Sequence, residues 1–275
     1  MAALTIFSSP FTAHASNITT KAGVTLKPTN KVYNIEVQKK LSDKIGVNKF
    51  KDFSLDKGQI ANMQFDKLNT LANLVDNKIS INGTVNALRD GKIGGNLYFL
   101  SPNGIAVGAS GVINAGSFTG MAVSKEYFDN ISKLEDATKF TSALDPENIQ
   151  YNNDPKKGID IQGVINAPGG ISLYATKIDI GKNAILRTDV EEVDFKKVVN
   201  VEGVDSGITG GLDAEYKNGD IILKAYAESI NDASTLTDEK EVENAVKNWE
   251  KISESEATIN VDGKIKSAND VSYQC

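Results

Sequence analysis

The sequence has few of the residues on which many enzymes and cross-linked extracellular domains depend. Its 275 residues include one cysteine, Cys275, so no disulfide can form within the chain and packing must stabilise the fold. Its one histidine is His14, and its two arginines, Arg89 and Arg187, lie far apart. The net charge is −6 and no dense basic cluster is present, so we expect no nucleic-acid partner.

The N-terminus resembles the end of an export signal. A short apolar run, residues 2–7, precedes Ala13-His14-Ala15, which fits the small-x-small pattern of a cleavage site. The run is too short to span a membrane, and no lysine or arginine precedes Lys21. We interpret residues 1–15 as a signal-peptide remnant, with a modest apolar arm as the alternative. Cleavage would remove His14 and with it the usual general base.

An internal repeat is the strongest evidence for the fold. Each copy has glycine at its third position and valine or isoleucine at its fifth, and Asn-Ala follows in three of the four copies. The copies are residues 81–87, 109–115, 161–167 and 261–267. Short strands separated by Gly and Asn corners suit stacked coils better than a sandwich. We therefore predict an all-β fold, a right-handed single-stranded parallel β-helix, in which a corner Asn bonds its equivalent about 4.8 Å away.

The remaining segments are assigned to a cap and to excursions from the coils. Residues 16–123 are predicted to form an N-terminal β cap, including a strand over residues 24–26, and the first coils. Within them, residues 68–75 fit either a strand or a short helix. Residues 124–275 continue the β-helix, with helical insertions near 124–136, capped by Ser124, and 237–253. We expect the insertions to cover apolar patches, with docking elements as the alternative.

Two further predictions concern the C-terminal half of the chain. The residues between Val190 and Val204 suit a hairpin that leaves the stack. Residues 257–274 re-enter the repeat and stop partway through a coil, without the polar cap that usually ends a solenoid. We therefore expect the sequence to be the front part of a longer solenoid.

The most specific stretch is a turn between two short strands, Ser101-Pro102-Asn103-Gly104-Ile105. With residues 81–87 and the surrounding strands, it resembles the secretion domain of two-partner-secretion exoproteins, the filamentous-haemagglutinin-type adhesins, and more narrowly the leukotoxin-type filamentous adhesins. The similarity covers residues 24–123. The family's turn is usually Asn-Pro-Asn-Gly-Ile, and here Ser101 replaces the first Asn, where its hydroxyl can still cap the turn. A second, Asn-Pro-Asn-Leu-type turn of the family is not evident.

The resemblance implies a route and a partner. The chain would be exported through the periplasm, recognised there by a dedicated outer-membrane β-barrel transporter with periplasmic docking domains, and folded at the cell surface. It would be secreted or surface-associated and without cofactor, and the full-length protein would contact host cells or glycans. The motif positions carried over are Pro102, Asn103, Gly104 and Ile105, with Ser101 as the variant position. Asn82 and Gly83 are further candidates for transporter contact, with the shaping of a corner as the alternative.

The rival classes are an enzyme and a stand-alone glycan-binding adhesive module. Parallel β-helices also include polysaccharide-cleaving enzymes, and Asp160 and Asp179 occupy similar Ile-Asp-Ile contexts 19 positions apart. Stacked one coil apart, they could bind Ca²⁺ or share a proton, and the alternative is an exposed polar position between two buried ones. The sequence has no phosphate-binding loop, no His-Glu-x-x-His and no Gly-x-Ser-x-Gly. We therefore expect no enzyme and no metal site.

Overall fold

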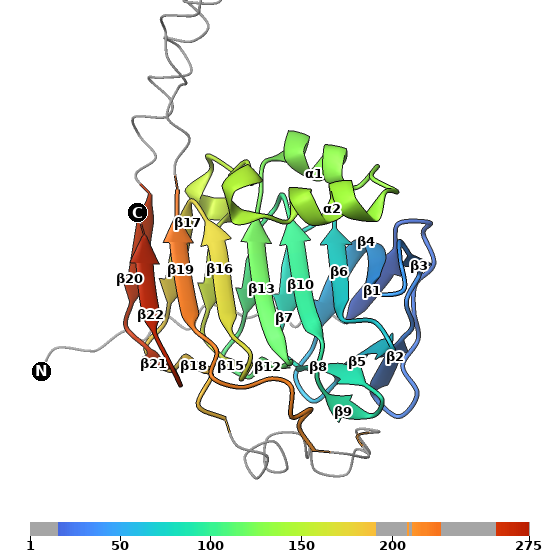
Figure 1. The fold of residues 1–275 in the computed structure, drawn as a ribbon, viewed down its shortest axis with the longest axis horizontal. Helices are drawn as coiled ribbons and strands as arrows, with labels where there is room; N and C mark the ends of the chain where they lie inside the picture. Colours follow the sequence, from blue (N-terminus) through green and yellow to red (C-terminus); the bar gives the residue numbers. More distant parts are fainter. Residues whose placement is uncertain (1–15, 191–207, 209–210, 227–256, 275) are drawn as a thin grey trace, which may run out of the picture.

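The computed structural model describes residues 16–190, 208, 211–226 and 257–274, which form a parallel β-helix (Figure 1). Short strands wind in successive coils around one elongated apolar core. In Figure 1 the front strands run upward while the coils advance from right to left, which makes the helix right-handed. The fold class predicted from the repeat is confirmed.

The coils have three faces. The first face contains β6 (Thr70–Val75), β10 (Asn96–Ser101), β13 (Ser117–Ala122), β16 (Ile171–Ala175), β19 (Ile221–Ala225) and β22 (Val271–Gln274). The second contains β7 (Ile79–Ile81), β11 (Ile105–Val107), β14 (Ile159–Ile161), β17 (Lys177–Ile180) and β20 (Thr258–Val261). The third contains β2 (Val32–Ile35), β5 (Ile60–Asp66), β8 (Thr84–Arg89), β12 (Val112–Asn114), β15 (Val164–Asn166), β18 (Ile185–Arg187) and β21 (Lys264–Lys266).

One long strand joins the first two faces at the N-terminal end. The first part of β4 (Ile45–Leu55) pairs with β6, and its last residues pair with β7. The first and second faces therefore form one 14-stranded sheet, and the third is a separate sheet of eight strands, which includes β9 (Lys92–Ile93) beside β8.

A β cap covers the first coil. β1 (Asn17–Thr20) and β3 (Lys39–Lys40) both pair antiparallel with β4, whereas the coils pair in parallel. The predicted strand over residues 24–26 is wrong, because Thr25 makes only an isolated bridge to Thr19. Antiparallel additions of this kind occupy an edge that would otherwise be free to pair with another chain.

The core is filled by aromatic side chains near the cap and by aliphatic ones further along. Phe53 packs edge-on against Phe50 and Phe99, with ring centroids 5.5 and 5.0 Å apart, and Phe99 contacts Phe118. Later coils replace them with stacked isoleucine and leucine. Because Phe99 lies between Phe53 and Phe118, which belong to other coils, burial in this core requires that the coils stack.

The repeat glycines lie at one corner of the coils. A Cβ atom added to any of them would lie 2.2–2.6 Å from a backbone carbonyl oxygen of the preceding coil. These glycines are Gly83, Gly111, Gly163 and Gly263. The corner thus requires glycine because the backbones of successive coils approach each other too closely for a side chain.

A ladder of asparagines runs along the third face, as predicted. Four of its five side chains donate through Nδ2 to Oδ1 of the equivalent residue in the preceding coil, over 2.9–3.1 Å, and Asn34 is the first acceptor. The members are Asn34, Asn62, Asn86, Asn114 and Asn166, of which all but Asn34 are buried. Since a buried amide without a partner is costly, the ladder favours this register.

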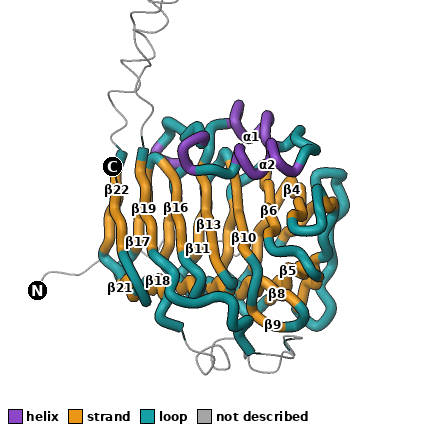
Figure 2. Tube along the Cα trace, viewed as in Figure 1, coloured by secondary structure: helices purple, strands orange, loops and turns teal. Residues whose placement is uncertain are grey.

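A helical excursion follows β13 and covers the outer side of the first face. It contains α1 (Lys125–Ile131) and α2 (Ala137–Ala143), then the 3₁₀ turns η1 (Pro146–Asn148) and η2 (Pro155–Lys157) (Figure 2). Ser124 caps α1 by accepting from Tyr127 N at 3.1 Å, as predicted. The predicted extent of one helix, to residue 136, is wrong, because Asp136 instead caps α2 by accepting from Lys139 N at 2.9 Å.

The excursion buries a row of outward-facing apolar side chains, as expected. Tyr127, Phe128, Ile131 and Phe140 pack over the strands. The row beneath them consists of Leu74, Leu100, Met121 and Tyr174, which are paired in register. None of the described helices is long and apolar enough to cross a membrane. The predictions for residues 1–15, for 237–253 and for nearly all of the 190–204 hairpin lie outside the described residues.

The segment 211–220 returns along the coils to an early corner, where it appears in orange in Figure 1. Asp213 forms an ion pair with Arg89 of β8 at 2.7 Å, and each side chain is 16% exposed. The ring of Tyr216 packs on Gly116 and Gly169, where an added Cβ would lie 2.7 Å from it. The segment therefore connects three coils from outside.

Candidate functional site

The turn that carries the family resemblance joins β10 to β11. Ser101 Oγ accepts a hydrogen bond from Asn103 N at 3.0 Å and donates one to Asn77 O at 2.9 Å. Ser101 therefore caps the turn through its hydroxyl, as expected from the sequence. Gly104 has φ +86°, which a residue with a side chain adopts only with strain.

The turn is bonded to the coil before it. Asn103 donates through Nδ2 to Asp76 O at 2.7 Å, and Gly104 O accepts from Ile79 N at 3.1 Å. The Asn103 amide thus supplies a donor to a backbone carbonyl in the turn between β6 and β7, which explains why an amide side chain suits this position.

The turn is also bonded to the segment that follows it in the stack. Asn152 donates through Nδ2 to Pro102 O at 2.6 Å, and Ile105 N donates to Gly158 O at 3.0 Å. Pro102, Gly104 and Ile105 are buried, and Asn103 is half-buried. In the folded protein the motif is therefore an internal connection between coils rather than an exposed surface loop.

Asn82 and Gly83 lie at a different corner from the turn. They follow β7, whose first residue pairs with Ile105 and whose last residue pairs with Val107, so the two motifs lie at opposite ends of the β7–β11 pair. Asn82 O accepts from Ser110 Oγ at 2.8 Å, and Gly83 fits closely against the preceding coil. Both residues shape the corner, and the structure does not bring them together with the turn.

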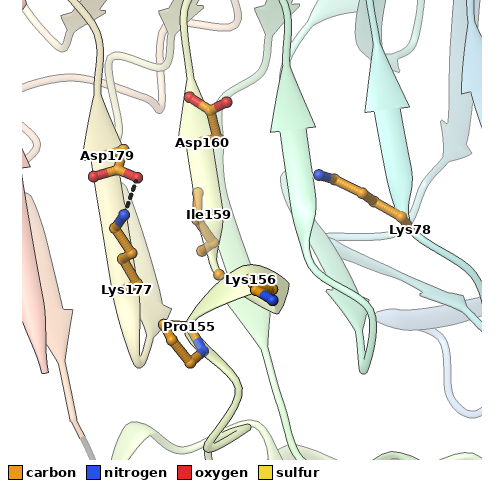
Figure 3. A pocket seen from close by; sticks show the side chains of 8 residues that line it. Lys78, Pro155, Lys156, Ile159, Asp160, Lys177 and Asp179 are labelled. Atoms are coloured by element: carbon orange, nitrogen blue, oxygen red, sulfur yellow. Dashed lines mark ion pairs between the residues drawn. The ribbon is translucent and has the colours of Figure 1, made fainter. Parts of the chain in front are cut away.

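Asp160 and Asp179 stack one coil apart, as the sequence suggested. They are paired in register on β14 and β17, and they line a groove of about 370 Å³ on the second face (Figure 3). Asp160 Oδ1 accepts from Gln162 Nε2 at 2.7 Å. Asp179 forms an ion pair with Lys177 at 3.1 Å and accepts from Asn260 Nδ2 at 2.7 Å.

The two carboxylates have separate side-chain partners. Asp160 accepts from Gln162, whereas Asp179 is paired with Lys177. Ca²⁺ takes six to eight oxygen ligands, whereas no group of three or more acidic, His or Cys side chains with metal-site geometry occurs among the described residues.

Sequence reasoning did not find the lysines of the groove. Lys78, Lys156 and Lys177 line it together with the two aspartates. Lys78 precedes β7, Lys156 belongs to η2 and Lys177 begins β17, so only the stacking of coils and the return of the excursion bring them together. No local pattern marks such a cluster, although Lys177 lies two positions before Asp179 on the same side of its strand.

Comparisons with models of protein families, with curated proteins and with solved structures found no match to this chain.

Proposed function

We propose that this chain is the N-terminal secretion domain of a large exported filamentous adhesin or leukotoxin. In this proposal a dedicated outer-membrane transporter recognises it in the periplasm, and it then nucleates β-helix folding at the cell surface. The supporting observation is the Ser-Pro-Asn-Gly-Ile turn at residues 101–105, located in the early coils of a parallel β-helix that begins with a β cap.

The contacts of the turn support a particular order of events. Pro102 and Gly104 are buried, and Asn152 and Gly158 bond to the turn from a later part of the chain. A transporter would therefore read the motif while the chain is unfolded, before those later residues cover it. After export, the same residues would join consecutive coils, which favours onward movement because the stacked coils are more stable than the extended chain.

The test is transporter-dependent export. The chain is expressed behind a functional signal peptide, with and without the cognate transporter, and the protein in the medium is quantified. We expect release only with the transporter. Release that is equal in its absence would contradict the proposal.

Two variants separate recognition from folding. Asn103→Ala removes the motif side chain, and Asn114→Ala weakens the fold through the ladder without touching the motif. The unfolding free energies of both purified variants are measured first, so that release can be compared with stability. We expect Asn103→Ala to reduce release more than Asn114→Ala does. If the loss of release is proportional to the loss of unfolding free energy in both variants, the turn acts only through folding.

A further inference from the structure

The groove on the second face is built by the register of four strands. Ile79, Ile105, Ile159 and Ile178 are paired in sequence across β7, β11, β14 and β17. The residues just before them are Lys78, Gly104, Gly158 and Lys177. Coils lie about 4.8 Å apart, so the backbones of Lys78 and Lys177 are separated by about 14 Å. The backbone of the next coil lies directly beside both glycines, since an added Cβ would lie 2.6 Å from Gly158 O at Gly104 and 2.3 Å from Lys177 O at Gly158. The groove therefore lies on the outer side of these strands, where the side chains of Lys78, Lys156 and Lys177 border it.

The groove offers cations without carboxylate partners. Among the residues that the structure describes, no carboxylate lies within 4.0 Å of the amine of Lys78 or Lys156, while Lys177 is paired with Asp179. Figure 3 shows Lys78 extending in the direction of Asp160, with one strand between them, and Lys156 on the turn that borders the groove. Two uncompensated ammonium groups around one concave surface favour an anionic ligand.

The aspartates narrow the choice of ligand. Asp160 and Asp179 are half-buried acceptors in the same groove, so a ligand that presents only carboxylates or phosphates is repelled at this side. A ligand with hydroxyl groups can instead donate hydrogen bonds to them. The lining contains neither an arginine nor an aromatic ring, so bases of a nucleic acid would have no stacking partner.

We propose that this groove binds an acidic oligosaccharide, whose carboxylates contact Lys78 and Lys156 and whose hydroxyl groups donate to Asp160 and Asp179. Its volume of about 370 Å³ lies within the range of small-ligand sites. Binding is expected to be weak and salt-dependent, since Lys78 and Lys156 are exposed. This inference does not depend on the proposed secretion function.

The test is a calorimetric titration of the full chain with tetragalacturonate, carried out at low and at moderate ionic strength. The control ligand is its fully methyl-esterified form, which keeps the sugar hydroxyl groups and loses the negative charges. We expect binding of the acid, weakening with salt, and no measurable binding of the ester. Absence of binding at low salt, or equal binding of the ester, would overturn the proposal.

Paired variants locate the site. Lys78→Ala with Lys156→Ala is expected to weaken binding about tenfold, because two charge contacts are lost. Lys57→Ala with Lys67→Ala removes the same charge from exposed turns outside the groove and is expected to leave the affinity unchanged. Equal weakening by both pairs, or inorganic phosphate binding as tightly as the oligosaccharide, would show a general anion effect and reject the saccharide site.

Discussion

Asn114 donates a hydrogen bond through Nδ2 to Oδ1 of Asn86 at 2.9 Å, and the two residues are paired one coil apart. Asn166 repeats the bond to Asn114 at 2.9 Å. These side chains are buried, so their amides are satisfied only when each coil sits in register on the last. The ladder thereby links a local sequence feature to the alignment of the whole solenoid.

Replacing Asn114 by alanine should destabilise the fold markedly. The change breaks two ladder bonds and leaves the Asn86 acceptor and the Asn166 donor without that partner. We expect a loss of about 2–4 kcal/mol in unfolding free energy, measured by urea denaturation. Asn130→Ala, at an exposed position of α1, is the control and should change it by less than about 0.5 kcal/mol. A similar effect of both variants would contradict the importance of the ladder.

The motif turn should depend on glycine for two separable reasons. Gly104 has φ +86°, and an added Cβ would lie 2.6 Å from Gly158 O. Gly58 has a similar φ of +79°, but nothing lies within 4 Å of its added Cβ. We expect Gly58→Ala to cost about 1 kcal/mol from backbone strain alone, and Gly104→Ala to cost at least about 2 kcal/mol more. Equal unfolding free energies for the two variants would show that the approach of Gly158 is unimportant.

Stability at alkaline pH should depend on Tyr127 of the helical excursion. Burial, with a smaller effect of the Asp145 carboxylate, raises the pKa of Tyr127 from 10.0 to about 12. The neutral phenol, which donates to Ala143 O, is therefore favoured in the folded state. Its contribution is complete below pH 10 and is lost as the pH rises through about 12, roughly 2–3 kcal/mol in all.

The measurement for Tyr127 is the unfolding free energy at several pH values between 9 and 12. Tyr127→Phe should be less stable than the wild type at pH 9 by about 1 kcal/mol, and its stability should fall less steeply above pH 10. Tyr273→Phe is the control, because Tyr273 is 53% exposed and should keep the wild-type slope. Identical slopes for Tyr127→Phe and the wild type would refute the assignment.

The ion pair between Arg89 and Asp213 should hold the segment 211–220 against the coils. Both side chains are 16% exposed, so the pair is less screened than a surface pair. A double-mutant cycle with Arg89→Met and Asp213→Asn should give a coupling free energy of about 1–2 kcal/mol. The exposed pair of Lys125 and Asp129 on α1 serves as comparison and should give no more than about 0.5 kcal/mol. Equal coupling free energies in both cycles would mean that partial burial does not strengthen the ion pair between Arg89 and Asp213.

The repeat could be predicted from the sequence because each coil has the same local requirements. A corner glycine is required wherever backbones approach closely, as at Gly111 and Gly163, and a buried Asn must find an identical partner. These demands recur at every coil and leave a pattern in the sequence. The stacking of Asp160 on Asp179 followed from the same periodicity.

Features that depend on contacts between distant segments could not be predicted from the sequence. Residues 68–75 fitted a helix or a strand because both sides of β6 are buried, Leu71 in the core and Leu74 beneath the excursion, which hides the alternation of a strand. The burial of the motif turn depends on Asn152, which lies 50 residues away. The lysine-lined groove depends on the return of the excursion to the second face.

The sequence alone thus determined the coil, its corners and its register, whereas the tertiary structure decided which surfaces remain open. The physical reason is the range of the interactions involved. Steric limits on a corner and the pairing of identical side chains repeat in each coil and act between neighbours. Covering Pro102 or assembling three lysines around a groove happens once, between segments whose proximity follows only from the completed fold.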